Sequence, residues 1–338
     1  MSEQMNMILD SLDRLYVDLA AMDPQASESW QRVEDFGVCN LFLDESQSGM
    51  DASWVEGAAA LRLLGLRSVA LPVGETMIAR HLLCAAGFEI LQGPIAIAIG
   101  KGEWSEDDGF SGSVTLPSTF PSSMHVIAAI DKPGKGACLL LDSAGAGSPA
   151  DGNHGYGEHY QSTLHFANCP AQLIPNLSPD RLIAFGAFLR TAQIAGALSA
   201  ALDMTIEYAK IRSQFGRELL KFQAIQQQIA VLTEEVAAIA SASASAALTM
   251  DKGSGQFAIA CAKLRANQAA GAGALIAHQV HGAIGITAEY SLHRFTNALW
   301  QWRSDFGNDR YWAEQIGRRI LVEGAGTPWA ILTEESLA

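Results

Sequence analysis

Residues 219–250, LLKFQAIQQQIAVLTEEVAAIASASASAALTM, decide the fold class of this chain. Apolar residues recur in this stretch at spacings of three and four, which is typical of a helix with one core-facing stripe. The stripe consists of Phe222, Ile225, Ile229, Leu232, Val236 and Ile239. The Ser-Ala run at 240–247 allows a neighbouring helix to approach closely. The stretch therefore predicts a long helix inside a bundle.

Two further long helices flank this one. The pattern predicts helices over residues 182–211 and over residues 257–279, the second of which ends near Gly282. Long antiparallel helices of this kind pack into a bundle. We therefore predict a C-terminal helical bundle over residues 176–338.

The first half of the chain has a different pattern of apolar and turn residues. Residues 1–90 carry helical periodicity, for example at 58–66 and 75–86, and predict an N-terminal helical domain. Residues 91–175 contain short apolar runs bounded by turn residues, which indicate a small antiparallel β-domain. The runs lie at 95–99, 126–130, 137–141 and 163–166. The predicted fold class is α+β, with helices, then strands, then a helical bundle.

Composition narrows the classes of function. With 49% hydrophobic residues and a net charge of -14, the chain can bury a large core and carries no basic patch that would suit nucleic acid. We find no uninterrupted apolar run of about 20 residues, so we expect no membrane span. The five cysteines form no CxxC pair and no secretory signal is visible, so we expect a cytoplasmic protein.

One polar loop could suggest a metal. His154 and His159 lie in the Gly-rich loop 145–160. No third ligand follows at a fixed spacing, so we expect a solvated loop and no metal site.

The segment 212–223 reads RSQFGRELLKFQ and could hold a ligand. The planar guanidinium of Arg212 can bind a pyrophosphate through two parallel hydrogen bonds. Phe215-Gly216 can form a turn that brings the backbone close to a ligand, and Phe215 and Phe222 supply flat apolar surface. From spacing alone, a solvated or salt-bridged Arg212 at a helix end and a Phe215 in the core are the more frequent arrangement.

The segment 279–290 reads QVHGAIGITAEY and holds two glycines at which the chain can approach a phosphate or ribose. These are Gly282 and Gly285. The alternatives from spacing alone are that Gly282 caps a helix and that His278 and His281 form an exposed pair.

Both segments resemble signatures of the acyl-CoA dehydrogenases, R-x-Q-F-G-x-x-(L/I)-x-x-F-Q and Q-x-x-G-G-x-G-x-T-x-E-Y. Residues 37–49, GVCNLFLDESQSG, also resemble a loop of that family. The resemblance implies FAD as cofactor, held chiefly by a neighbouring subunit, so that oligomerisation is needed. It implies FAD contacts from Arg212, Gln214, Phe215, Phe222, Gln279, Gly282, Ala283 and Gly285.

The chain departs from the family in its catalytic base and in its β-region. The family desaturates an acyl-CoA between Cα and Cβ, and a carboxylate must take the α-proton. The usual Glu position holds Phe306, and the alternative position near Gly186 also lacks Glu. Asp305 could serve after a shift of one residue; a helix-cap or surface Asp is the alternative. The family's T-E-P-x-x-G-S-D-like loop and G-x-K-x-W-I-(T/S)-N strand are absent, so we expect this β-region to hold flavin poorly.

Together these departures resemble the shorter chain of the heterotetrameric acyl-CoA dehydrogenases of bacterial steroid side-chain breakdown. That resemblance implies a homologous larger catalytic partner and an acyl-CoA substrate, such as a steroid side chain. Electron-transfer flavoprotein or oxygen is the implied acceptor. Two alternatives stay open: a self-sufficient homotetramer that uses Asp305 as base, and a non-enzymatic structural subunit.

Overall fold

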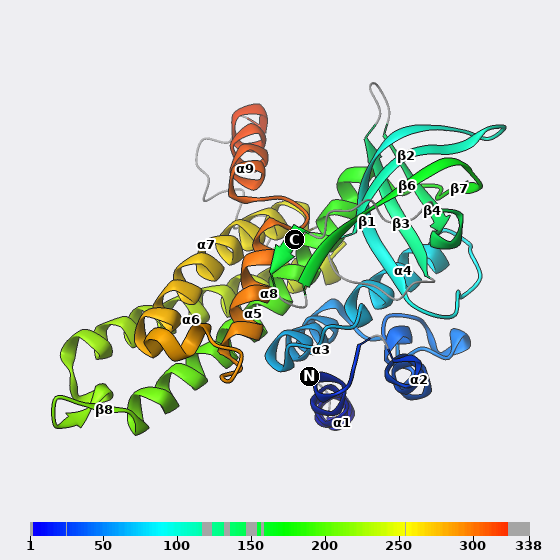
Figure 1. Cartoon of the computed structure of the whole chain (residues 1–338). Helices are drawn as coiled ribbons and strands as arrows, with labels where there is room; N and C mark the ends of the chain where they lie inside the picture. Colours follow the sequence, from blue (N-terminus) through cyan, green and yellow to red (C-terminus); the bar gives the residue numbers. More distant parts are fainter. Residues whose placement is uncertain are drawn as a thin grey trace. The chain divides into compact units, whose positions relative to one another are not determined.

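Helix α5 (Pro179–Ile211) is the longest helix of the computed structural model (Figure 1). It is apolar on all sides, as expected of a helix that is covered all round. In its most apolar window, 89% of the residues are buried. The structure describes residues 3–24, 26–116, 124–131, 136–146, 154–156, 159–253 and 255–323.

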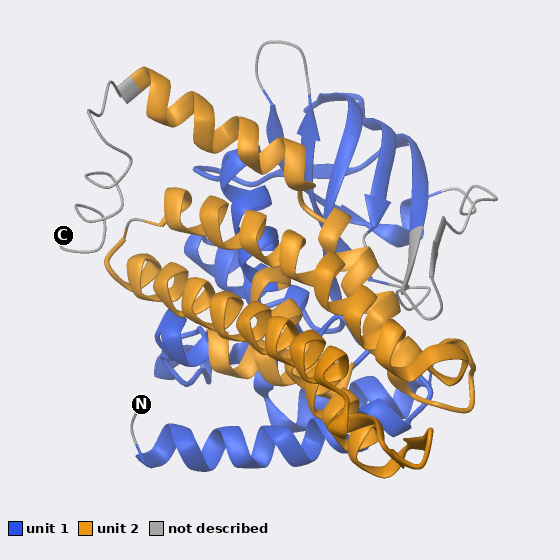
Figure 2. Cartoon of the chain, turned by 90° about the vertical axis from the view of Figure 1, so that its left-hand side faces the viewer, with its two compact units in different colours: residues 1–57, 69–189 blue, residues 58–68, 190–338 orange. Residues whose placement is uncertain are grey.

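The chain forms two compact units (Figure 2). Unit 1 comprises residues 1–57 and 69–189, and unit 2 comprises residues 58–68 and 190–338. Residues 1–57 and 69–90 thus belong to the same unit as the sheet, whereas the sequence suggested three domains. Two boundaries fall inside helices, α3 (Trp54–Arg67) and α5, and the third directly follows α3.

Unit 1 begins with helices. The predicted helices at 58–66 and 75–86 are confirmed, and the first of them lies in unit 2. The bounds are α1 (Glu3–Ala21), α2 (Ser27–Phe36), α3 (Trp54–Arg67) and α4 (Val73–Ala85), with short 3-10 turns η1 (Val38–Asn40) and η2 (Glu45–Gln47).

The sheet of unit 1 is mixed, so the prediction of an antiparallel sheet is wrong. Among the described residues its strands lie in the order β5-β6-β2-β1-β3-β4-β7, and β1 pairs with β3 in parallel. Apolar runs locate strands but carry no information on their direction. The bounds are β1 (Ile95–Ser105), β2 (Gly109–Leu116), β3 (His125–Asp131), β4 (Ala137–Asp142), β5 (His154–Tyr156), β6 (His159–Cys169) and β7 (Ala171–Leu173), with a 3-10 turn η3 (Ser143–Gly145).

Strand β2 was missed because Gly and Ser interrupt its apolar residues. Its Phe110, Val114 and Leu116 are buried in the core of the sheet. They occupy alternate positions along the strand, and this period of two was the available signal.

Unit 2 is a helical bundle, as predicted. Its core joins residues of four helices, and small residues allow close contact; a Cβ on Gly273 would lie 2.4 Å from Leu198 Cδ2. Besides most of α5, it contains strands β8 (Ser213–Gln214) and β9 (Arg217–Glu218) and 3-10 turns η4 (Leu219–Lys221) and η5 (Gly282–Ile286). Its remaining helices are α6 (Gln223–Asp251), α7 (Gln256–His281), α8 (Leu292–Ser304) and α9 (Asp309–Glu323).

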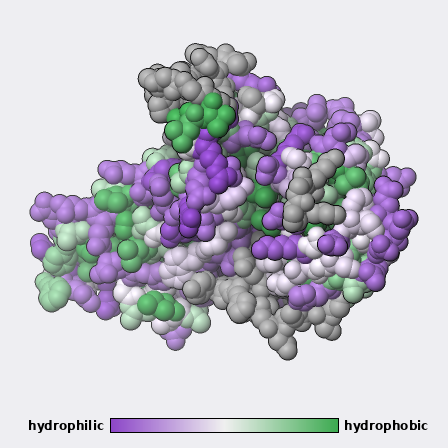
Figure 3. All heavy atoms as spheres, turned by 90° about the horizontal axis from the view of Figure 1, so that it is seen from above, coloured by the Kyte–Doolittle hydropathy of each residue, from purple (hydrophilic) through white to green (hydrophobic). Residues whose placement is uncertain are grey.

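Helix α6 is covered far less than predicted. Leu232 and Ile239 of the predicted stripe are buried, but its other members are only half-buried. In its most apolar window only 22% of the residues are buried. Both α5 and α6 are long and apolar enough to cross a membrane. Buried core helices such as α5 also meet this criterion of length and composition. Apolar patches lie between polar ones over the helical bundle, at the left of Figure 3.

Candidate functional site

The chain turns sharply after α5. Strands β8 and β9 form a two-residue hairpin with Phe215 and Gly216 at its tip. Both tip residues have positive φ, 52° and 79°, which is the condition of a type I′ turn. Glycine adopts this backbone readily, whereas a bulky residue such as Phe is strained in it. We call residues 212–222 the Arg212 hairpin.

The Arg212 hairpin is exposed. Every residue from Arg212 to Arg217 is exposed, and Phe215 is 90% exposed, so it is not a core residue. Arg212 forms no ion pair with any described residue, whereas the Arg217 guanidinium lies 4.0 Å from the centre of the Phe222 ring. Arg212 is thus the arginine of this hairpin that is open to an external anion.

The second predicted element lies at the end of α7, and we call residues 279–286 the Gly282 turn. Gly282 has a φ of 65° and its N–H donates to the carbonyl of His278, so it caps the helix. A Cβ at Gly282 would meet no atom within 4 Å, and Gln279, Gly282 and Ala283 are exposed. Gly285 differs because it is buried and a Cβ there would lie 2.9 Å from His281 Cβ. The open backbone is therefore at Gly282.

The structure brings the segments that lead into these two elements together within unit 2. The ring of Tyr208, four residues before Arg212, stacks on the ring of His281, the residue before Gly282. Strand β8 of the hairpin lies at the end of the helical bundle away from α9 (Figure 1). The residues that the sequence predicted as a cofactor grip thus share one end of the bundle.

The alternative of an exposed histidine pair is wrong. His281 is 3% exposed and its ring stacks on Tyr208. His278 is half-buried, with Nε2 2.9 Å from Thr296 Oγ1 and its ring stacked on Trp300. Burial lowers the pKa of both imidazoles, which favours their neutral forms. Helical spacing places two residues on one face but does not tell what covers that face.

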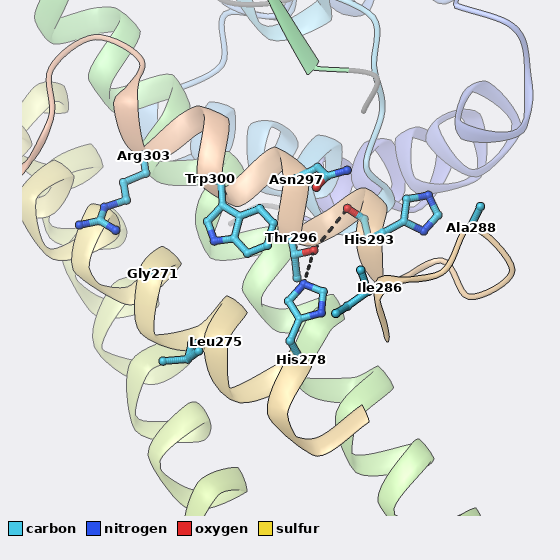
Figure 4. A pocket seen from close by; sticks show the side chains of 10 residues that line it. All are labelled: Gly271, Leu275, His278, Ile286, Ala288, His293, Thr296, Asn297, Trp300 and Arg303. Atoms are coloured by element: carbon cyan, nitrogen blue, oxygen red, sulfur yellow. Dashed lines mark hydrogen bonds between the residues drawn. The ribbon is translucent and has the colours of Figure 1, made fainter. Parts of the chain in front are cut away.

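A pocket of about 630 Å³ lies beside the Gly282 turn (Figure 4). Figure 4 shows His278 directed toward Thr296, with the Trp300 ring beside it. The sequence reasoning missed this pocket, although its residues on α8 recur at helical spacing. The lining residues are Gly271, Leu275, His278, Ile286, Ala288, His293, Thr296, Asn297, Trp300 and Arg303.

Asp305, the predicted base, lies at the C-terminal end of α8 with a side chain that is 0% exposed. Its Oδ2 accepts a hydrogen bond from Arg190 Nε at 2.8 Å, and its Oδ1 accepts one from Gln301 Nε2 at 2.9 Å. Burial raises the pKa of Asp305, and the Arg190 charge opposes that rise. The carboxylate is thus fully enclosed and paired inside the bundle.

A buried lysine extends this polar network. Lys263 Nζ donates to Asn267 Oδ1 at 2.5 Å and to the carbonyls of Trp302, Arg303 and Gly307. It therefore satisfies carbonyls at the end of α8, which the helix cannot satisfy itself. Burial lowers the pKa of Lys263 to about 7, while the Asp305 charge opposes that change.

The described residues contain no group of three His, Cys, Asp or Glu side chains that could hold a metal ion. Much of the loop 145–160 lies outside the described residues, and so does 117–121, part of the β-region that departs from the family pattern.

Comparisons with known proteins bear on the family. Residues 180–321 match the family model "Acyl-CoA dehydrogenase, C-terminal domain". The acyl-CoA dehydrogenase IpdE2 of Mycobacterium tuberculosis is 27% identical over 278 residues, 81% of each chain. Residues 180–321 thus form an acyl-CoA dehydrogenase C-terminal domain, and most of the chain is similar to an acyl-CoA dehydrogenase. These similarities support an oxidoreductase that acts on CH–CH bonds.

Solved acyl-CoA dehydrogenase structures share the fold of the whole chain. A variant of the Tcur3481-Tcur3483 steroid ACAD superposes with a TM-score of 0.81 at 19% identity, covering 96% of this chain and 99% of that chain. A chain of the ChsE4-ChsE5 complex from Mycobacterium tuberculosis gives 0.80 at 22% identity, covering 97% and 99%. At these identities the likeness shows the fold alone.

The acyl-CoA dehydrogenase family implies FAD, and the exposed residues of this chain fit one side of that cofactor. A pyrophosphate needs a cation, which Arg212 can provide, and a backbone that it can approach closely, which the open turn at Gly282 can provide. Gln214 and Gln279 add exposed amides, and Phe215 adds an exposed ring. All of these groups face outward from unit 2, which is the arrangement expected for a cofactor held mainly by another chain.

Proposed function

We propose that this chain is a subunit of an FAD-dependent acyl-CoA dehydrogenase. In this proposal its Arg212 hairpin and Gly282 turn complete the FAD site of a homologous, larger partner chain. The partner carries out the α,β-desaturation of the acyl-CoA.

The exposed, strained tip of the Arg212 hairpin carries this proposal. Phe215 is 90% exposed and has a φ of 52°. A bulky residue at positive φ costs about 1–3 kcal/mol and is found mainly at functional sites. An exposed Phe, and an Arg that forms no ion pair with a described residue, are best explained by contacts with a ligand or with another chain.

The poorly covered helix α6 supports a partner chain. Exposed apolar residues are Val231 and Leu248 on this helix, and Ile211 just before the hairpin. An exposed apolar surface of this kind marks an interface. The likeness in fold to a steroid ACAD and to the ChsE4-ChsE5 complex favours a heterotetramer and an acyl-CoA with a steroid side chain as substrate.

Each residue has a role in this proposal. When bound, FAD accepts the hydride that leaves Cβ of the acyl group. Arg212 neutralises the pyrophosphate, and Gln214 and Gln279 hydrogen-bond to the nucleotide half. Gly282 and Ala283 let the backbone approach closely, and Gly285 keeps the turn compact against His281. Phe215 and Phe222 form the apolar edge of the site.

We further propose that the base lies in the partner chain. A base must reach the α-carbon of the substrate. Asp305 is enclosed and bonded through both of its oxygens, so it is better suited to hold Arg190 than to take a proton from a thioester. The self-sufficient homotetramer is thereby disfavoured. Electron-transfer flavoprotein as the electron acceptor stays part of the proposal.

The test is to co-express the chain with a homologous, longer acyl-CoA dehydrogenase chain from the same genome and to measure bound flavin from its visible absorbance. We expect a yellow complex that loses most of its FAD when Arg212 is replaced in Arg212→Ala. Lys210→Ala is the matched control, because Lys210 is a nearby exposed cation that pairs with Glu207. It should retain FAD.

Two results would contradict the proposal. Unchanged flavin content in Arg212→Ala would favour a structural subunit without a role in FAD binding. Stoichiometric FAD and turnover in the chain purified alone, abolished by Asp305→Asn, would favour the self-sufficient enzyme.

A further inference from the structure

Three aromatic rings meet between the Arg212 hairpin and the Gly282 turn. Tyr208 lies on α5, one helical turn before Arg212, and its ring stacks on His281 with centroids 4.6 Å apart and planes 25° apart. Tyr290, which follows η5, lies 5.1 Å from the His281 ring and 6.1 Å from the Tyr208 ring. The rings come from three separate segments of unit 2, and we call them the Tyr208 stack.

Hydrogen bonds fix the central ring of the Tyr208 stack. His281 Nδ1 lies 2.8 Å from the carbonyl oxygen of Ala277, which can only accept, so Nδ1 carries the proton. Nε2 lies 3.4 Å from the Tyr290 hydroxyl oxygen, and the backbone of Met204 also contacts the ring. Burial lowers the pKa of His281, which favours a neutral ring. The Ala277 carbonyl therefore fixes the orientation of the imidazole.

The connections from the stack to the two elements are short. The Arg212 N–H donates to the Tyr208 carbonyl at 2.9 Å, and the Leu219 N–H donates to the Arg212 carbonyl at 2.8 Å, which closes the hairpin. On the other side Gly282 directly follows His281 in the chain. The residues from Ile211 to Arg217 are all exposed, so the hairpin has little packing of its own.

We propose that the Tyr208 stack is the positioning element of the FAD grip, with Tyr208, His281 and Tyr290 as positioning residues. This inference rests on the function proposed above. The stack holds the end of α5 and the end of α7 at a fixed separation, so that Arg212 and Gly282 can contact the same pyrophosphate. Binding groups must be held to within about 0.5 Å of the productive geometry, and packed residues behind them provide this.

The first test measures order in the chain without any cofactor. Tyr208→Leu removes the ring but keeps an apolar side chain, and Tyr208→Phe keeps the ring. By hydrogen exchange we expect Tyr208→Leu to speed the exchange of amides in both residues 212–222 and residues 279–286 by about tenfold, and Tyr208→Phe to restore slow exchange. Phe257→Leu is the control, since Phe257 is a buried aromatic near the other end of α7 that contacts Arg319.

The second test measures FAD retention in the complex with the larger chain. Tyr208→Leu should weaken FAD binding about tenfold, whereas Tyr208→Phe and Phe257→Leu should bind as the wild type does. Tyr290→Leu is a second variant in case Tyr208→Leu does not fold, because Tyr290 is only half-buried. It should loosen the same two segments.

The outcomes separate this inference from the function on which it rests. If Arg212→Ala releases FAD while Tyr208→Leu and Tyr290→Leu keep both FAD and slow exchange, the positioning role is wrong and the proposed function stands. If Tyr208→Leu speeds exchange in only one of the two segments, the stack does not link them. If Arg212→Ala retains FAD, the proposed function itself fails.

Discussion

The molecule contains two Phe-Gly turns with nearly the same backbone and opposite surroundings. Phe215 and Gly216 have φ values of 52° and 79°, and Phe306 and Gly307 have values of 53° and 106°. The first turn is exposed, whereas Phe306 is buried with the Arg190 guanidinium over its ring at 5.7 Å.

The arginines near these turns differ in the same way. Arg212 is exposed and forms no ion pair with a described residue, while Arg190 is 1% exposed and bonded to Asp305. A strained Phe-Gly backbone is therefore not a sign of function by itself. The exposed turn can bind an external anion because its arginine is open, and the buried turn can stabilise the bundle because its arginine is neutralised.

The largest difference in stability between the two turns is expected when one charge near each turn is removed. Asp305→Ala leaves Arg190 buried without its partner, so we expect the free energy of unfolding to fall by about 3–5 kcal/mol. Arg212→Ala changes an exposed side chain and should shift it by less than about 0.5 kcal/mol. Urea denaturation of both variants measures this difference. Equal effects would mean that the Arg190–Asp305 pair does not stabilise the fold.

Adding one methyl group to the glycine of each turn should give a smaller difference in stability between the two turns. A Cβ at Gly307 would lie 2.6 Å from Trp312 Nε1 and from Tyr311 Cδ1, in addition to the strain of its positive φ. We expect Gly307→Ala to cost about 2–4 kcal/mol. A Cβ at Gly216 would meet nothing within 4 Å, so Gly216→Ala should cost only the backbone strain, about 1 kcal/mol. Thermal unfolding distinguishes the two; a larger loss for Gly216→Ala would contradict the geometry.

The last expected effect is a change of stability with pH near the buried turn. Burial lowers the pKa of Lys263 to about 7, below its value in the unfolded chain. Between these two pKa values the unfolded state binds more protons, so stability should rise with pH, by at most about 1.4 kcal/mol per pH unit. Below the folded pKa both states bind the proton, so stability no longer changes with pH through Lys263.

Lys263→Met should remove this rise, because it removes the titrating group. Denaturation of the wild type and the variant between about pH 7 and pH 9 measures it. The same slope in both proteins would mean that another group is responsible.

Much of the fold was predictable from periodicity. The long helices of the bundle were predicted because their apolar residues recur at helical spacing, and the end of α7 near Gly282 was predicted from its glycine. The parallel pairing of β1 with β3 was not, because strand direction depends on connections rather than on local pattern. Strand β2 was missed because Gly112 and its serines hid an alternation that only the buried side chains reveal.

The candidate site was also only partly predictable from the sequence. Arg212 and Gly282 were predicted from the resemblance of two local motifs, and the structure brings the residues just before them, Tyr208 and His281, into contact. The enclosure of Asp305 could not be predicted because its partner Arg190 is 115 residues away in the chain. Spacing alone also allowed an exposed His281, because the Tyr208 ring that covers it comes from another helix.

The uncovered surface of α6 has a consequence for the life of the protein in the cell. Under the proposed function, a newly made copy that displays this apolar helix is a substrate for chaperones and proteases until the partner chain covers the helix. The steady-state amount of the protein should then follow the supply of the covering chain rather than its own rate of synthesis. Surplus copies would be degraded, so the two chains would accumulate in a fixed ratio.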